Sequence, residues 1–109
     1  MDFEDYQKKS RKTALYPDVG KNYVYPTIGL AGETGEVSEK IKKVIRDKGG
    51  KIDDETRKMI KKELGDVLWY VSQLASELGL SLDEIAEKNI EKLYSRLERG
   101  KLQGSGDNR

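Results

Sequence analysis

The sequence predicts an all-α protein, a four-helix bundle that assembles as a homo-oligomer. Apolar residues recur at helical spacing in long segments, and glycines and prolines that end helices separate those segments. No stretch alternates apolar and polar residues as a half-buried strand does. The 109 residues suit one domain. We expect a single helical domain over residues 1–100 and a C-terminal tail over 101–109.

The first two predicted helices cover about residues 3–15 and 27–48. The first ends before Pro17, because a proline disfavours helical backbone at the residue before it. The second ends at Gly49 or Gly50, which can take the left-handed conformation at a helix end. Its inner face is marked by Leu30, Val37, Ile41 and Val44.

The third predicted helix starts at Asp53 or Asp54, where an acidic residue is favourable, and ends at Gly79. Its long apolar stripe consists of Ile60, Leu64, Val67, Val71, Leu74 and Leu78. The fourth helix opens with Ser81 and Glu84, which have the spacing of a capping box. Its apolar face consists of Leu82, Ile85, Ala86, Leu93 and Leu97. One bundle of this length does not cover all these faces, so we expect a homodimer or homotetramer.

The composition excludes several classes of function. With 21 basic and 20 acidic residues, the chain has no overall attraction to nucleic acid or membranes. Without cysteine or histidine it has no disulfide, no thiolate or histidine-based catalysis and no usual zinc site. Oxygen ligands remain, and these suit magnesium, manganese or calcium. No segment resembles a membrane span or a signal peptide, so we expect a cytoplasmic protein.

Four acidic residues flank the apolar faces of the second and third helices. Glu33 falls on the apolar stripe, and Glu36 follows one turn later. Glu63 and Asp66 repeat this arrangement on the third helix. If the two helices pack together, the four carboxylates converge and can hold one or two magnesium ions. The alternative is that the acids pair with lysines, as acids on charge-rich helices commonly do.

Two glycines lie beside these acids inside the second helix. A glycine in a helix interior costs about 1 kcal/mol relative to alanine, so Gly32 and Gly35 need a reason. Their lack of side chains either leaves room for ions, water or a ligand, or lets a neighbouring helix approach closely.

These residues resemble the MazG-like family of nucleoside triphosphate pyrophosphohydrolases, whose motif is Glu-Glu-x-x-Glu followed by Glu-x-x-Asp. Here "GETGE" supplies Glu33 and Glu36, and "ELGD" supplies Glu63 and Asp66. The resemblance extends from "TALYP" to "GSGDNR". It implies a fold of the all-α NTP pyrophosphatase type and the four acids as ligands of Mg²⁺, with Mn²⁺ possible. It also implies cleavage of a nucleoside triphosphate to the monophosphate and diphosphate, as nucleotide-pool housekeeping.

One position departs from the family motif. Gly32 stands where the family has its first glutamate, which in some members is proposed to activate the attacking water. The general base is therefore open: Glu33 or Glu36 fills the role, Glu39 reaches in, or the metal alone acidifies the water.

Further candidates for substrate contact lie on the third and fourth helices. Asn89 is expected on the inner stripe, where it bonds to another helix or, as the resemblance supports, to substrate. Lys92 and Arg96 follow on the same side and bind phosphates or form a solvated face. Tyr70, one turn beyond Asp66, forms a wall for the nucleobase or part of the core. Additional candidates are Trp69, Tyr16, Tyr23 and Tyr25 for the base, and Arg109 for a phosphate.

The leading interpretation is an enzyme that acts on a nucleoside triphosphate, with dUTP or dCTP as specific options and phosphoribosyl-ATP as a less favoured one. The competing interpretations are a helical bundle that binds nucleotide and metal without turnover, and a regulatory interaction protein. The sequence leaves open the preferred base and sugar, the number of ions and the choice between dimer and tetramer.

Overall fold

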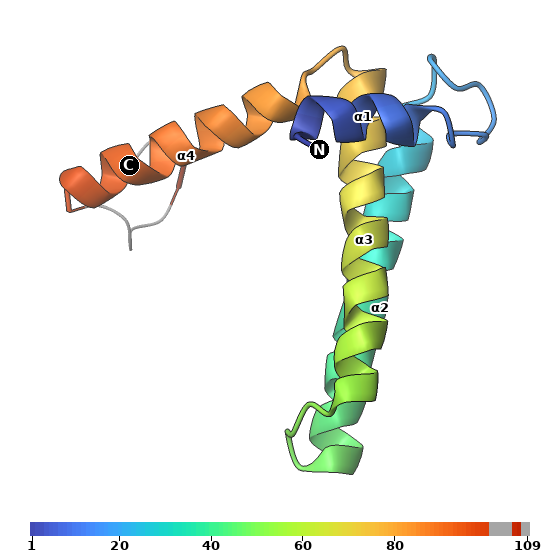
Figure 1. Cartoon of the computed structure of the whole chain (residues 1–109), viewed down its shortest axis with the longest axis vertical. Coiled ribbons are helices and arrows are strands. Elements are labelled where there is room, and N and C mark those ends of the chain that lie inside the picture. The colour runs from blue at the N-terminus through green and yellow to red at the C-terminus, as the bar shows by residue number, and fades with distance from the viewer. Residues whose placement is uncertain (101–105, 108–109) are drawn as a thin grey trace.

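The computed structural model of the protein describes residues 1–100 and 106–107. Its helices are α1 (Phe3–Arg11), α2 (Val24–Lys48), α3 (Asp54–Glu77) and α4 (Leu82–Glu98), and the described part of the chain contains no strand. The all-α prediction is thus confirmed. Helices α2 and α3 form a long antiparallel hairpin, α1 crosses α3 near one end of it, and α4 extends away as a separate arm (Figure 1).

The predicted closure into one bundle does not occur within a single chain. Among the described residues, α4 packs against α1 and makes no comparable contact with the hairpin. The reason lies in the turn before α4. Gly79 has a positive φ of 68°, and the chain leaves α3 there at a wide angle instead of folding back along it (Figure 1).

The helix ends follow local chemistry. The Asp53 carboxylate accepts the Thr56 N–H at 2.8 Å at the start of α3, and the Ser81 hydroxyl accepts the Glu84 N–H at 3.2 Å at the start of α4. The N-caps predicted at Asp53 and Ser81 are therefore confirmed, but of the predicted capping box only the bond to the Ser81 hydroxyl is present among the described hydrogen bonds. Gly49 ends α2 in the left-handed conformation with φ 61°, as the sequence indicated.

Two predicted helix boundaries were wrong. Helix α1 ends at Arg11, because Thr13 and Ala14 bond three residues back and tighten the chain into turns. Helix α2 begins at Val24, so Pro26 lies inside its first turn. The missing N–H of a proline costs nothing there, since the first N–H groups of a helix have no partner within the helix.

A buried polar seam joins α1 to α3. Ser72 and Gln73 on α3 are fully buried. The Ser10 and Ser72 hydroxyls lie 3.0 Å apart, and the Gln73 amide donates to Ser10 at 3.2 Å. Arg11 donates to the Gln73 carbonyl at 3.1 Å. Because each buried polar group has a partner, the seam fixes how α1 sits on α3.

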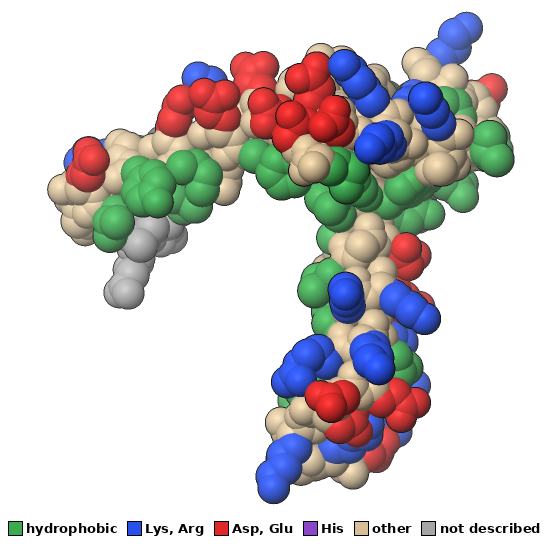
Figure 2. Space-filling view, viewed as in Figure 1, with side chains coloured by type: hydrophobic (Ala, Val, Ile, Leu, Met, Phe, Trp, Pro, Cys, Tyr) green, Lys and Arg blue, Asp and Glu red, His purple; other side chains and the backbone are tan. Residues whose placement is uncertain are grey.

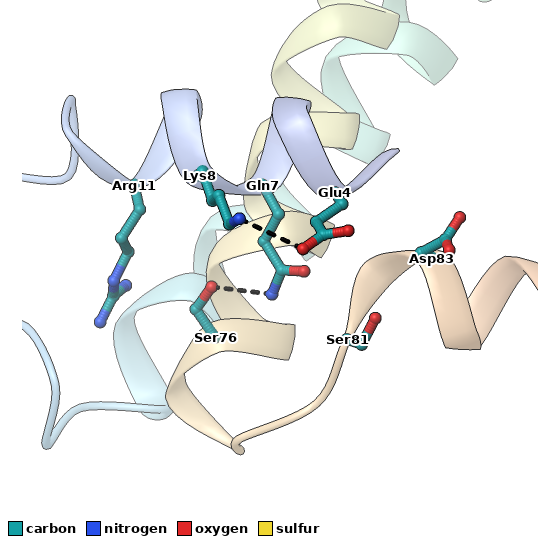
Figure 3. A pocket seen from close by; sticks show the side chains of 7 residues that line it. All are labelled: Glu4, Gln7, Lys8, Arg11, Ser76, Ser81 and Asp83. Carbon is teal, nitrogen blue, oxygen red and sulfur yellow. Dashed lines mark hydrogen bonds and ion pairs between the residues drawn. The ribbon is translucent and has the colours of Figure 1, made fainter. Parts of the chain in front are cut away.

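Gln7 connects α1 to the turn between α3 and α4 (Figure 3). Its amide nitrogen donates to the Ser76 hydroxyl at 3.0 Å and to the Leu80 carbonyl at 2.9 Å. Its carbonyl accepts the Leu82 N–H at 2.8 Å. These bonds hold both sides of the turn, so Gln7 sets the direction in which α4 leaves the hairpin.

Much apolar surface stays uncovered in the single chain. Among the described residues, the buried apolar side chains are Ala14, Tyr16, Pro26, Val44, Ala75 and Leu82. On α4, the exposed large apolar side chains are Ile85, Ile90, Tyr94 and Leu97. Figure 2 shows hydrophobic side chains along the underside of the α4 arm and in the corner where the arm meets the hairpin. None of the helices in the described part of the chain has the length and apolar character that a membrane span requires.

Candidate functional site

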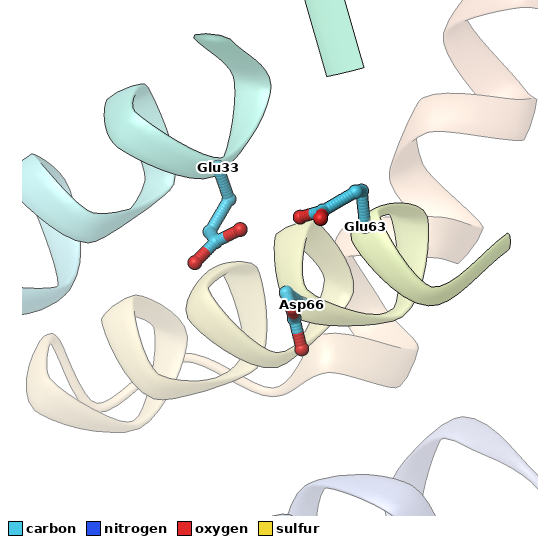
Figure 4. A group of neighbouring side chains, drawn as sticks. All are labelled: Glu33, Glu63 and Asp66. Carbon is cyan, nitrogen blue, oxygen red and sulfur yellow. The ribbon is translucent and has the colours of Figure 1, made fainter. Parts of the chain in front are cut away.

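Three carboxylates converge in the middle of the α2–α3 hairpin. Glu33 comes from α2, and Glu63 and Asp66 come from α3. Each offers one oxygen, and these oxygens lie within 4.8 Å of one another. Glu33 and Glu63 are half-buried and turn toward each other across the hairpin (Figure 4). The antiparallel packing of the two helices therefore assembles the acidic group that the spacing predicted, with three of its four members.

The group carries more negative charge than its surroundings compensate. Lys40 lies 3.6 Å from Glu63. Within the described residues, neither Glu33 nor Asp66 pairs with a lysine or arginine. Burial, a hydrogen bond with Glu63 and the charges of the neighbouring acids together raise the pKa of Glu33. Pairing with lysine thus accounts for only one of the three acids.

The donor set fits a hard divalent cation. Carboxylate oxygens are the ligands that Mg²⁺ and Mn²⁺ prefer, and Mg²⁺–oxygen bonds are about 2.1 Å long. Two ligands on opposite sides of such an ion are therefore about 4 Å apart. Oxygens within 4.8 Å of one another reach that spacing through small side-chain rotations.

Glu36 lies outside the three-carboxylate group. It is exposed, one turn beyond Glu33, and its charge contributes to the raised pKa of Glu33. Glu39 is occupied elsewhere, with Lys42 at 2.9 Å and Lys43 at 3.8 Å. Within the described residues, Glu36 forms no ion pair.

The glycines divide into two kinds. Among the described residues of one chain, a Cβ at Gly32 or Gly35 would meet nothing within 4 Å, so of the two alternatives for these glycines the single chain shows open space and not a close helix crossing. The close approach occurs at Gly29, where a Cβ would overlap the Tyr70 ring. Sequence reasoning missed Gly29, because its partner lies on another helix.

Aromatic rings continue from Tyr70 into the loop before α2. Tyr70 lies edge-on to Trp69 with centroids 5.0 Å apart and is 6.5 Å from Tyr25. Tyr16 stacks on Tyr25 at 4.8 Å. Burial and the charges of neighbours that include Tyr25 and Glu33 raise the pKa of Tyr70. The cluster thus borders the acidic group, whereas Tyr23 is exposed and outside it.

Tyr6 of α1 is a second residue that sequence reasoning missed. Burial and then the charge of Asp66 raise its pKa. Tyr6 therefore lies on the Asp66 side of the acidic group. Its phenol could not be assigned from spacing, because α1 reaches this position only through its crossing of α3.

The candidates on α4 are not brought to the acids within one chain. Asn89 is exposed, contrary to its expected place on an inner stripe, because α4 has no helix against that stripe. Lys92 is half-buried and Arg96 is buried. Both contact Asp107. Arg109 lies outside the described residues.

The family model of the MazG nucleotide pyrophosphohydrolase domain matches residues 27–100, which include all four acids. The chain belongs to this MazG family. A relative in the comparison, the "Gene 37 protein" of Mycobacterium phage L5, is 46% identical over 114 residues, across the whole of both chains. No solved structure matches the chain.

MazG membership confirms the resemblance and places the chain, at family level, among nucleotide pyrophosphohydrolases. The MazG match begins after α1, so Tyr6 and Gln7 lie outside the matched range. Gly32 lies inside it, one residue before Glu33.

Proposed function

We propose that this MazG protein is a Mg²⁺-dependent nucleoside triphosphate pyrophosphohydrolase, with Mn²⁺ as a possible substitute. It converts a ribo- or deoxyribonucleoside triphosphate and water to the monophosphate and diphosphate, as nucleotide-pool housekeeping. The observation that carries the proposal is the meeting of Glu33, Glu63 and Asp66 across two helices, within 4.8 Å of one another, in a chain of this family.

The roles of the acids follow from their positions. Glu33, Glu63 and Asp66 would hold the ion, which supplies charge neutralisation for the phosphates and a lowered pKa for water. Glu36 accepts the proton of the attacking water, since it is exposed and outside the ligand group. The water oxygen bonds to the α-phosphorus as the bond to the bridging oxygen breaks, and diphosphate leaves.

The aromatic cluster supports a place for the base. Tyr70 borders the acidic group and packs with Tyr25 and Trp69. Aromatic faces stack on any nucleobase. A nucleotide whose base stacks on this cluster has its phosphates directed toward the acidic group. Other parts of the substrate are bound by Asn89, Lys92 and Arg96 of α4.

That last contact requires a second copy of the chain. The accessible surface is 8052 Å², whereas a compact monomer of 12.4 kDa exposes about 6,100 Å². The radius of gyration is 16.7 Å against about 13 Å for a compact domain of this length. The difference in area, roughly 1,900 Å², exceeds the about 800 Å² that each partner buries in a stable interface. We infer a homodimer or homotetramer in which α4 packs on another chain.

The test is diphosphate release from a panel of ribo- and deoxyribonucleoside triphosphates with Mg²⁺, for the wild type and for Glu63→Gln. We expect turnover by the wild type and at least a hundredfold loss in the variant, which removes one ligand charge and keeps the shape. Nucleotide-dependent thermal stabilisation without release would instead identify a binding protein. If the protein shows neither nucleotide-dependent stabilisation nor diphosphate release, the regulatory interaction protein is favoured. The cytoplasmic location and the division at residue 100 stay predictions.

A further inference from the structure

The residues Gly106 and Asp107 lie against α4. Arg96 donates from Nη2 to the Asp107 carbonyl at 2.6 Å and to the Gly106 carbonyl at 3.4 Å. The Asp107 carboxylate lies 3.2 Å from Lys92 Nζ and 3.5 Å from Arg96 Nη2. A carboxylate therefore sits between the two cations of α4.

Lys92 and Arg96 offer more positive charge and more hydrogen-bond donors than the Asp107 carboxylate pairs with. The Arg96 side chain is only 4% exposed, and its Nε is buried without a hydrogen-bond partner in the described part of the chain. A buried guanidinium N–H without an acceptor is costly. Lys92 and Arg96 together carry two positive charges against the single charge of Asp107. The pair can accept an anion with more charge and more oxygens.

The Asp107 carboxylate is held weakly enough to leave. Its side chain is 84% exposed, and exposed ion pairs contribute little because water and salt screen them. Lys92 and then Arg96 lower the pKa of Asp107, so the carboxylate is charged at neutral pH. The carbonyl bonds to Arg96 do not involve that charge, so we expect them to persist when the carboxylate is changed.

We propose that Asp107 is an internal counter-ion that occupies the Lys92–Arg96 pair and competes there with a phosphoryl anion. This inference rests on the proposed function only for the identity of the anion, the phosphate groups of the substrate or the released diphosphate. The carboxylate offsets one of the two positive charges between substrates and weakens the binding of diphosphate. Asp107 is thus an autoinhibitory contact, and its removal tightens anion binding.

The experiment measures inorganic diphosphate binding to the full chain in EDTA at constant ionic strength, by NMR titration. Without metal, the carboxylates of the hairpin repel the anion, so binding reports on α4. We expect the Arg96 Nε–H resonance to shift on titration. Asp107→Asn should bind diphosphate about fivefold more tightly than the wild type, the factor that corresponds to loss of an exposed ion pair. The effect should shrink in high salt.

Two sets of variants serve as controls. Asp54→Asn removes an equally exposed carboxylate, which pairs with Arg57 at 3.1 Å on the hairpin, and should leave the affinity unchanged. Lys92→Gln, on a half-buried side chain, should weaken binding without the folding risk of a change at buried Arg96.

Equal affinity of Asp107→Asn and the wild type would overturn the proposal, as would an Arg96 signal that diphosphate does not move. A protein that binds diphosphate at Arg96 as expected, yet releases none from any triphosphate, keeps this inference and overturns the proposed function. The two proposals therefore fail separately.

Discussion

At the residue scale, Glu33 carries the argument for the cation that we propose at the acidic group. Its carboxylate is half-buried and shares a small volume with Glu63 and Asp66. Burial, the hydrogen bond with Glu63 and repulsion from the neighbouring acids together raise the pKa of Glu33. A divalent ion reverses the repulsion, because it gives each carboxylate an opposite charge within bonding distance.

The first prediction separates the proton acceptor from the metal ligands. Glu36→Gln should lower turnover by about a hundredfold or more, the contribution typical of a general base. Mg²⁺ should still raise the melting temperature, because Glu33, Glu63 and Asp66 remain. Steady-state kinetics and thermal unfolding with and without Mg²⁺ provide the measurement. Glu39→Gln is the matched control, since Glu39 is paired with Lys42 and Lys43. Equal turnover in Glu36→Gln and the wild type would exclude Glu36 as the base.

The second prediction compares two glycines in α2. Gly29→Ala places a methyl group in the Tyr70 ring and should destabilise the protein by about 1–3 kcal/mol. Gly35→Ala meets open space and should stabilise it by up to about 1 kcal/mol, since alanine favours helix. Urea unfolding followed by circular dichroism measures both. We expect the free energy of unfolding to fall in Gly29→Ala and to rise in Gly35→Ala. Changes of the same sign in both variants would refute the Tyr70 contact.

At the scale of elements, α1 and the loop after it act as a clamp on the end of the hairpin. Gln7 holds the turn into α4, Ser10 closes the seam with α3, and Arg11 reaches Glu77 at 2.7 Å. The Glu77 carboxylate also accepts hydrogen bonds from the Tyr16 hydroxyl and from the Gly20 N–H of the loop. The aromatic cluster depends on this clamp, because Tyr16 lies in the same loop.

The third prediction concerns the stability of this clamp with pH. Burial alone would raise the pKa of Glu77, but hydrogen bonds from Tyr16, Gly20, Arg11 and Asn22 lower it from the ordinary 4.5 to about 2. A lowered folded-state pKa means that the stabilisation is complete above pH 4.5 and is lost as pH falls toward 2. Its size is about 3 kcal/mol.

The test is urea unfolding from pH 7 to pH 2 for the wild type and Glu77→Gln. The variant should be less stable at neutral pH, and the difference between the two should narrow below pH 4.5. Glu87→Gln, on an exposed side chain of α4, should follow the wild type. A difference that stays constant across this range would show that the Glu77 charge does not support the loop.

At the scale of the whole molecule, the chain has the shape of a hairpin with an outstretched arm (Figure 1). The acids lie on the hairpin and the α4 cations lie on the arm. Each chain therefore holds two parts of the proposed site that it does not itself join. In the proposed homo-oligomer, a second copy packed in the apolar corner would bring the two parts together.

The fourth prediction tests this assembly by mixing two inactive variants. Glu63→Gln loses the metal site and Lys92→Gln loses the phosphate contact of α4. If each site takes its acids from one chain and α4 from another, random exchange of subunits gives functional sites at about one quarter of the wild-type number. Light scattering should show a dimer or tetramer for each protein. Activity that does not recover on mixing of exchanged, correctly assembled variants would place both parts in one chain.

The sequence by itself determined much of what depends on residues close along the chain, although it misplaced the end of α1 and the start of α2. Helical spacing identified the four helices, and Asp53, Ser81 and Gly49 identified their ends, because caps act within one turn. The spacing of Glu33, Glu63 and Asp66 predicted an acidic group, since a packed helix pair directs its marginal residues to one side. Composition restricted the ligands to oxygen.

Only the tertiary structure decided how these elements meet. Gly29 faces Tyr70, and Tyr6 lies beside the charge of Asp66. Asp107 lies between the cations of α4. Each of these relations joins residues on different segments, so it depends on crossing angles that helical spacing does not contain. The direction of α4 is the largest feature that depends on such tertiary contacts. It follows from the turn at Gly79 and the hold of Gln7, not from the apolar pattern of α4 itself.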